Sequence, residues 1–457
     1  MSKHYNILDH GALSGGIDCT CAIQSAIDTC FTNGGGTVVI PAGEYHTGDI
    51  RLRSHVTLYL QKDAVLKGSR DPMAYYHYRD DKLEPLPEDW ITEALYHRGP
   101  RMSTPEFMAK PGSRWVHGLI KAMGAEDIAV IGEEGSVIDG QDCYDELGEE
   151  NYRGPHAVSL FYCRNVRFSG YTIRNSANWA HAIFDSENIH MDHVAVYAGH
   201  DGVHYTSCRN MTIEDCAFYT GDDCIAGIDL VNVTVRRCIL NTACSAFRMG
   251  GTNVFIEDCH MYGPAVYLFR GSMTKEEKAA CMPSPANPGG VTRDEAGHRF
   301  NMLSAYTYYA DYTREIPVQP GNIVLKDCRI ENADRLLHYN YSGNETWQVG
   351  KPLRSIRMEG ITASGISLPL NAYGDRDIPL HLEIVNSDVA FREDIDASFM
   401  HLCNYDYVLL ENVKIRLSGD KPLVKIWSDA GEVRLKNVEA PNLRVETADE
   451  AFFARPI

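Results

Sequence analysis

The stretch from Asn188 to Cys259 reads NIHMDHVAVYAGHDGVHYTSCRNMTIEDCAFYTGDDCIAGIDLVNVTVRRCILNTACSAFRMGGTNVFIEDC. An Asn followed by an apolar residue recurs in it at Asn188, Asn210, Asn232 and Asn253, at spacings of 22, 22 and 21. The segments after each Asn alternate apolar with polar residues and are too short for helices. Such a fixed period predicts a solenoid, in which each repeat forms one coil of a parallel β-helix.

The same period places three aspartates at equivalent positions. Asp201 lies in HDGV, while Asp222 and Asp223 lie in TGDDC, 21 and 22 residues later. Since adjacent coils stack about 4.8 Å apart, the three carboxylates are predicted to meet on one face. Successive residues of a regular strand point to opposite faces, so both members of the pair face solvent only at a bend, for which Gly221 is suited. Clustered carboxylates repel one another and indicate a functional site. The alternative is three ordinary surface acids at strand ends.

Composition narrows the range of partners. The chain has 457 residues, a formal net charge of −19 and no long apolar run. Its acidic balance argues against nucleic acid and anionic membranes as partners. The beginning of the sequence, MSKHYNILDHGALSGG, lacks the apolar core of a secretory signal, so we expect a cytoplasmic protein.

The cysteines follow the repeat as well. Among the 14 in the chain, Cys216, Cys238 and Cys259 share one coil position, and Cys328 is expected to join them. Small stacked side chains at one position fill the interior of a solenoid. We therefore expect a ladder of free thiols rather than disulfides.

The pattern extends over the whole chain as one domain, 1–457. Residues 21–30 have helical spacing, with Ala22, Ile23, Ala26 and Ile27 on one face, and predict a short N-terminal helix that caps the first coil. Two stretches, about 71–118 and 271–317, break the period and are predicted to be long loop insertions. Such insertions in repeat proteins usually lie on the binding face.

Several of these segments resemble glycoside hydrolase family 28, the polygalacturonase family. The likeness runs over most of residues 5–275 and includes YNILDHGA, AIQSAID, GGGTVVIPAGEY, LYLQKDAVLKG, NSANWAHAIFDSENI, HDGV and TGDDC. It implies an all-β, right-handed parallel β-helix of the pectin-lyase type that hydrolyses pectin with inversion. It also implies that Asp222 is the general acid, and that Asp201 and Asp223 hold and deprotonate the attacking water. Crowded like charges suit this division, because they raise the pKa of one carboxyl.

One departure from the family pattern concerns its histidine. The family has a Gly-His-Gly segment in the next coil, where this chain reads CSAFRMGG and Ser245 takes the place of the His. His200 or His204, on either side of Asp201, is a candidate replacement. Either is also interpretable as a surface histidine.

The cations that hold the uronic carboxylate in the family also differ. The Arg-x-Lys pair appears here as Arg270-Gly271-Ser272, so Arg270 matches and the Lys is missing. Arg248 in CSAFRMGG is a new cation one coil after Asp223, and its alternative reading is a salt bridge to the aspartates. If neither arginine binds a uronate, a neutral or less charged sugar is the expected substrate.

Aromatic residues are expected at the sugar subsites, because the C–H faces of sugars pack on rings. The candidates are Trp179 in SANW, then Tyr306 and Tyr339. Two long insertions would narrow an open groove into a pocket. With a cytoplasmic location, this favours exo-action on short pectin-derived oligosaccharides.

Two other classes of function remain open. A β-helix lyase or epimerase acting on a uronate would abstract a C5 proton, and a non-catalytic sugar-binding solenoid would need no chemistry at all. The three aspartates argue against the second alternative. We expect no cofactor and no metal site. The alternative is calcium at the aspartate cluster, since hard cations favour oxygen ligands. The chain has no other metal motif, because His200 and His204 at this spacing are a weak metal signal. A homodimer is compatible with the exposed faces of a solenoid.

Overall fold

The structure is a computed structural model, and it describes residues 3–75, 117–267, 269–272, 302–310, 319–345, 347–428 and 431–452. The fold class is the predicted right-handed parallel β-helix. The contacts within the chain divide it into two compact units. Unit 1 comprises Met1–Asp222 and Val266–Arg299, and unit 2 comprises Asp223–Ala265 and Phe300–Ile457. The prediction of one domain over 1–457 stays a prediction.

The described residues of unit 1 form one α-helix, three short 3₁₀ turns and nineteen strands. Its elements are β1 (His4–Asn6), η1 (Ile7–His10), α1 (Thr20–Thr32), β2 (Gly36–Ile40), β3 (Gly43–Thr47), β4 (Ile50–Arg51), β5 (Val56–Leu60), β6 (Ala64–Gly68), η2 (Pro72–Tyr75), β7 (Gly118–Met123), β8 (Glu126–Gly132), β9 (Val137–Asp139), β10 (Tyr144–Glu149), β11 (His156–Phe161), β12 (Arg164–Ser169), β13 (Thr172–Arg174), β14 (His181–Phe184), β15 (Glu187–Asp192), β16 (Ala195–Ala198), β17 (Val203–Thr206), β18 (Arg209–Glu214), β19 (Ala217–Thr220) and η3 (Arg270–Ser272).

Unit 2 contains, among its described residues, only strands. They are β20 (Ile225–Arg236), β21 (Ile239–Thr242), β22 (Ser245–Glu257), β23 (His260–Tyr262), β24 (Met302–Tyr308), β25 (Gly321–Lys326), β26 (Arg329–Glu331), β27 (Ala333–Asn340), β28 (Ser355–Glu359), β29 (Thr362–Ile366), β30 (Leu370–Tyr373), β31 (Leu380–Phe391), β32 (Met400–Cys403), β33 (Tyr405–Arg416), β34 (Val424–Ile426), β35 (Glu432–Glu439) and β36 (Val445–Thr447).

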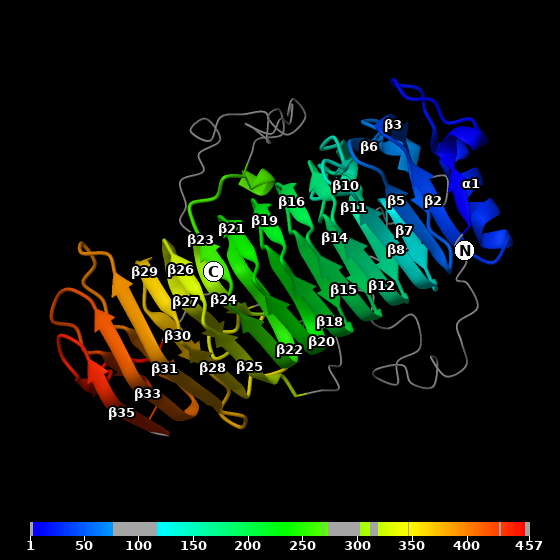
Figure 1. Ribbon diagram of the computed structural model, residues 1–457. Helices are drawn as coiled ribbons and strands as arrows, with labels where there is room; N and C mark the ends of the chain where they lie inside the picture. Colours follow the sequence, from blue (N-terminus) through cyan, green and yellow to red (C-terminus); the bar gives the residue numbers. More distant parts are fainter. Residues whose placement is uncertain are drawn as a thin grey trace. The chain divides into compact units, whose positions relative to one another are not determined.

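Strands of successive coils pair in parallel within each unit, with local register shifts in unit 2 at β20–β22, β29–β31 and β31–β33 (Figure 1). In unit 1, for example, β14 pairs with β17, β15 with β18 and β16 with β19. In unit 2, β22 pairs with both β24 and β25. The repeat of the sequence is therefore the repeat of the coil, as predicted.

The repeating Asn residues explain the period in physical terms. Asn165, Asn188 and Asn210 all have φ near +55°, a left-handed conformation that Asn tolerates better than most residues. The Nδ2 of Asn188 donates to Oδ1 of Asn165 at 3.0 Å, and the Nδ2 of Asn210 donates to Oδ1 of Asn188 at 3.1 Å. Each Asn thus fixes a bend in its own coil and bonds to the coil before it.

The predicted cysteine ladder is present within unit 2. Cys238, Cys259 and Cys328 are buried and free, and the neighbouring thiols raise the pKa of Cys259. Cys216 is a buried free thiol of unit 1. Stacked free thiols at one coil position agree with their expected role as small interior side chains.

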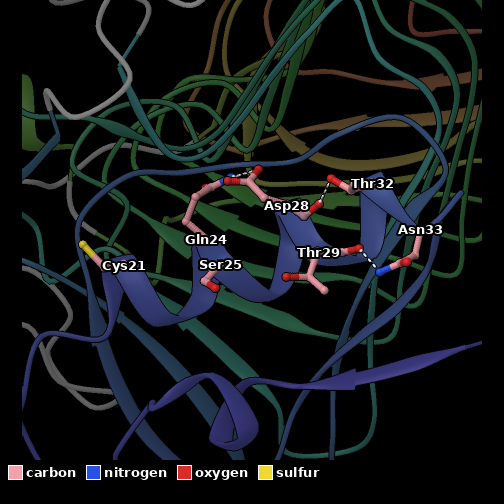
Figure 2. Close-up of a pocket in the computed structure, with 7 residues that line it drawn as sticks. All are labelled: Cys21, Gln24, Ser25, Asp28, Thr29, Thr32 and Asn33. Atoms are coloured by element: carbon pink, nitrogen blue, oxygen red, sulfur yellow. Dashed lines mark hydrogen bonds between the residues drawn. The ribbon is translucent and has the colours of Figure 1, made fainter.

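The predicted N-terminal helix is α1, whose buried face carries Ile23, Ala26 and Ile27. Its other face is polar, as Figure 2 shows for the shallow pocket that lies along the helix. There Gln24 donates to Asp28 at 3.0 Å, and Asn33 donates to the carbonyl of Thr29 at 2.8 Å. Solenoids need such a polar cap over their first coil.

The predicted insertions are only partly described. Residues 76–116 and 273–301 lie outside the described residues. The prediction of a loop over 271–317 was wrong for 302–308, because β24 is a regular strand there and pairs with β22. Tyr-rich alternation in LSAYTY (303–308) was the available signal. Within the described residues, no helix combines the length and apolar character that a membrane crossing requires.

Candidate active site

Three successive bends of unit 1 carry the residues that the sequence singled out. Trp179 lies between β13 and β14, Asp201 lies between β16 and β17, and Asp222 follows β19. The backbone N–H of Ala180 donates to the carbonyl of Asp201 at 2.9 Å. The N–H of Gly221 donates to the carbonyl of Ala198, also at 2.9 Å. The coil repeat thus stacks the bends and fixes the aspartates along with them.

Asp201 is held by His204. The Nδ1 of His204 lies 2.8 Å from Oδ2 of Asp201, and only 4% of Asp201 and 6% of His204 are exposed. The imidazole also stacks on the indole of Trp179, with ring centroids 3.8 Å apart and planes 10° from parallel. A buried carboxylate needs such a hydrogen-bond donor. Trp179 is 8% exposed, so its ring mainly supports His204.

His200, the other candidate, is completely buried. Its ring lies 5.6 Å from the ring of Tyr152, between centroids. Neither candidate is therefore a surface histidine. His204 is the one with a hydrogen bond to Asp201, a distinction that two histidines four residues apart did not reveal in the sequence.

A third histidine, His181, supports the bend that carries Asp201. Its Nδ1 lies 3.2 Å from the carbonyl of Gly202, and its Nε2 lies 2.9 Å from the hydroxyl of Tyr171. Burial lowers the pKa of His181 to about 4, so the ring is neutral near pH 7. A neutral ring with N–H at Nδ1 donates to Gly202 and accepts from Tyr171. The sequence analysis missed this residue, although it stands at the start of a coil strand.

Near Asp222, unit 1 holds a cluster of polar residues formed by Glu149, Arg153 and Asn178. Arg153 Nη1 donates to Oδ1 of Asn178 at 3.2 Å, and Asn178 Nδ2 donates to Glu149 at 3.4 Å. Arg153 Nε lies 3.8 Å from the Glu149 carboxylate. Burial raises the pKa of Glu149 to about 8, Arg153 opposes this effect and the charge of Asp222 adds to it. The charge of Arg153 interacts with Asp222 as well, so this cluster contributes charged groups of both signs to the surroundings of that carboxyl.

The sequence analysis missed this cluster for two reasons. Glu149 and Arg153 lie in or beside β10, in a segment between β9 and β11 that does not follow the repeat. Asn178, in contrast, precedes His200 and Asp222 by 22 and 44 residues. That spacing was an available signal.

Arg270 does not present a free cation. Its side chain is buried and forms an ion pair with Asp142, and its Nη1 also approaches the Asp142 carbonyl at 3.5 Å. The guanidinium lies 5.8 Å from the ring centroid of Tyr152. A buried guanidinium that is paired with a carboxylate is poorly placed to bind a uronate, so the prediction that Arg270 binds substrate is corrected.

Unit 2 begins with Asp223, which is 2% exposed. The N–H of Ser245 donates to its Oδ1 at 2.9 Å, and Arg248 Nη1 lies 3.5 Å from its Oδ2. Arg248 keeps 28% of its side chain exposed and lies over the ring of Tyr309, 4.7 Å from the centroid. The alternative reading of Arg248 as a salt-bridge partner is therefore correct, and enough of the side chain remains exposed to meet a ligand.

Ser245, whose N–H bonds to Asp223, also belongs to a small network of side-chain hydroxyls. Ser245 Oγ is 3.0 Å from Oγ1 of Thr307, which is 2.6 Å from Oγ of Ser304. All three residues are buried. Ser245, which stands where the family has a histidine, thus anchors Asp223 through its backbone and β24 through its hydroxyl.

The predictions that Tyr306 and Tyr339 contact the sugar were wrong, because both side chains are buried. Tyr306 and Tyr339 are 0% exposed. The hydroxyl of Tyr306 donates to the carbonyl of Met249 at 2.9 Å, and that of Tyr339 accepts from the N–H of Leu353 at 2.9 Å. Tyr306 pairs with Phe247, an interior position of its coil. Both rings therefore belong to the core of unit 2 and not to a sugar subsite.

The arrangement gives the aspartates different environments. Asp201 and Asp223 are buried, and each carboxylate has a hydrogen-bond partner, His204 for Asp201 and the Ser245 N–H for Asp223. Asp222 is more exposed and has an acidic neighbour in Glu149. Asp222 is therefore the most accessible of the three carboxyls, and its role as the general acid stays a prediction from the resemblance. That all three meet at one point stays a prediction from the coil period.

Comparison with known proteins confirms the resemblance. The model of glycosyl hydrolases family 28 matches residues 109–246, which contain all three aspartates. A probable polygalacturonase of Vitis vinifera is 30% identical over 235 residues, covering 48% of this chain and 43% of that protein. Mannuronan C5-epimerase AlgE4 of Azotobacter vinelandii is 55% identical over only 66 residues, 14% of this chain and 12% of that protein. The chain thus spans less than half the length of these curated relatives.

A solved structure supports the fold. An exopolygalacturonase from Thermotoga maritima superposes with a TM-score of 0.60 at 18% identity, covering 93% of this chain and 91% of that one. At this identity the likeness concerns the fold and carries no information on substrate.

Proposed function

From the match of residues 109–246 to glycosyl hydrolases family 28, we propose that this protein is a glycosidase that hydrolyses O-glycosidic bonds in galacturonate-containing, pectin-derived oligosaccharides. The observation that carries the proposal is the contrast among the three aspartates. Asp201 and Asp223 are buried and held by donors, whereas Asp222 is more exposed and has an acidic neighbour. Hydrolysis with inversion needs this division into one acid and a base that holds water.

The mechanism follows from these environments. Asp222 donates its proton to the glycosidic oxygen, and the bond from that oxygen to the anomeric carbon breaks. A water molecule held by Asp201 and Asp223 attacks the anomeric carbon from the opposite face and gives one proton to a carboxylate. Each of these two carboxylates is held in place by a hydrogen bond, Asp201 by one with His204 and Asp223 by one from the Ser245 N–H. The configuration at the anomeric carbon inverts.

Recognition of the acidic sugar is assigned to Arg248 in this proposal. Its guanidinium is partly exposed, lies 3.5 Å from the Asp223 carboxylate and packs over the ring of Tyr309. An Arg248→Ala variant should raise KM for a galacturonate trimer roughly tenfold, the loss of one charge-assisted contact, and should leave the KM for a galactose trimer nearly unchanged. If KM rose equally for both trimers, Arg248 would not bind the sugar carboxylate and would only position Asp223.

We also propose exo-action on short chains. What supports it is the sequence, in which the period breaks over about 71–118 and again after residue 271. Loops at these places would close one end of a groove. A product series that shows internal cleavage of long galacturonan would contradict this part of the proposal.

The experiment that tests the function compares the wild type with Asp222→Asn on galacturonate and galactose oligomers. New reducing ends, product masses and ultraviolet absorbance are measured. Asp258→Asn serves as the control, because Asp258 is an exposed acid with φ near +51°, where Asn fits well. We expect saturated products from the wild type and the control, and none from Asp222→Asn. An unsaturated, ultraviolet-absorbing product would instead indicate a lyase, and binding without turnover would indicate a sugar-binding solenoid.

A further inference from the structure

A second pocket lies within unit 2, at the bends that follow β30, β32 and β34. Its volume is about 930 Å³, within the range of ligand sites. The lining residues that matter for its chemistry are Arg376, Asn404, Asp406, Trp427, Ser428 and Phe452.

Coil register shows that this pocket is remote from Asp223. A column of outward positions runs through unit 2 by direct strand pairing from Arg248 through Thr307, His338, Asn371 and His401 to Lys425. Five coil steps at about 4.8 Å each separate Arg248 from Lys425 by roughly 24 Å. Trp427 follows Lys425 by two residues, so one sugar unit cannot reach both places.

One wall of the pocket is aromatic. Trp427 is half-buried, with the ring of His401 at 5.1 Å and that of Phe452 at 6.2 Å, both nearly edge-on to it. The Nζ of Lys425 lies 5.1 Å from the Trp427 centroid. Neighbouring rings and a cation fix the indole in one orientation, which lowers the entropy cost of stacking a ligand on it.

Polar groups of both kinds surround this wall. Arg376 is exposed, and no described residue forms an ion pair with it; it presents a fork of donors. Asp406 is an exposed acceptor, 3.7 Å from the ring of His381. Ser428 Oγ accepts from the N–H of Asn404 at 3.0 Å, which leaves its own hydroxyl proton to donate.

Sugars combine apolar C–H faces with hydroxyls that both donate and accept hydrogen bonds. An aromatic wall beside an arginine, an aspartate and a serine matches that chemistry. We propose that this pocket, which we call the Trp427 pocket, is a second carbohydrate site that binds one pyranose unit by stacking on Trp427 and hydrogen bonding to Arg376 and Asp406. Because it needs no turnover, this site does not depend on the proposed hydrolytic function.

The test follows the indole N–H resonance of Trp427 by NMR in the full chain. The chain has five tryptophans, and a Trp427→Phe variant assigns the relevant signal. Galacturonate trimer and galactose trimer are titrated separately into Asp222→Asn protein, in which hydrolysis is blocked. We expect a saturable shift of the Trp427 signal with a Kd of about 1 mM, a range that suits an accessory site.

Two arginine variants test whether Arg376 contacts the bound sugar. Arg376→Ala should weaken galacturonate binding about tenfold and galactose binding less, because only the acid makes a charge-assisted contact. Arg329→Ala, an exposed arginine paired with Glu331, is the control and should change neither. A Trp427 signal that moves with neither trimer in folded protein would overturn the proposal. Absence of hydrolysis by the wild-type protein, together with an intact Trp427 response, would count against the proposed function only.

Discussion

Replacing His204 by Phe tests the support of the candidate base. Phe keeps an aromatic ring to stack on Trp179 but removes the nitrogen that lies 2.8 Å from Asp201. A hydrogen bond to a charged group contributes about 1.5–3 kcal/mol. Since about 1.4 kcal/mol corresponds to a factor of ten in rate, kcat/KM should fall roughly 10- to 150-fold. Unfolding free energy should fall as well, because the buried Asp201 carboxylate loses its donor.

The assay is initial-rate hydrolysis of galacturonate trimer together with urea unfolding. His204→Asn is the rescue variant, because its amide nitrogen lies close to the position of Nδ1 and should restore part of the rate. His190→Phe is the matched control. His190 lies 2.9 Å from Glu214 in the same unit, but its side chain is 42% exposed. It should therefore cost less than 1 kcal/mol of stability and no activity. A folded His204→Phe protein with unchanged kcat/KM would refute the reasoning.

Three further outcomes are expected. Asn188→Ala should lower the unfolding free energy by about 1–2 kcal/mol in urea, because it breaks two ladder bonds and places Ala at positive φ, whereas Asn188→Gly should cost less. Burial raises the pKa of Glu149 to about 8, so the protonated side chain is tolerated in the folded protein at acid pH and its ionisation lowers the unfolding free energy as the pH rises through about 8. Glu149→Gln cannot ionise and should therefore flatten this decline, as thermal unfolding at several pH values would show. Iodoacetamide should label the exposed Cys21 in native protein and the buried Cys259 only after unfolding, as peptide mapping would show.

The regular parts of the fold were predictable because their causes are local. An Asn in a left-handed bend, an apolar strand and a small buried side chain recur at one period, and each needs only its neighbouring coil. The helix α1 was equally readable, since Ile23, Ala26 and Ile27 form one helical face. The same period predicted the coil positions of the three aspartates, because they are 21 and 22 residues apart.

What the sequence did not reveal arises from contacts across long distances along the chain. The partner of Arg270 is Asp142, 128 residues away, and no repeat connects them. Tyr306 follows a break in the period, so its position inside or outside the coil was undetermined until β24 paired with β22. Glu149 lies in a segment outside the repeat. Electrostatic neighbours of this kind depend on the folded structure.

The most direct measurement of the central claim is proton NMR of the anomeric centre released from galacturonate trimer within the first turnovers. The account predicts a saturated product of inverted configuration from the wild type. It predicts loss of that product in Asp222→Asn while the variant stays folded. A retained configuration, an unsaturated product or undiminished hydrolysis by Asp222→Asn would contradict it.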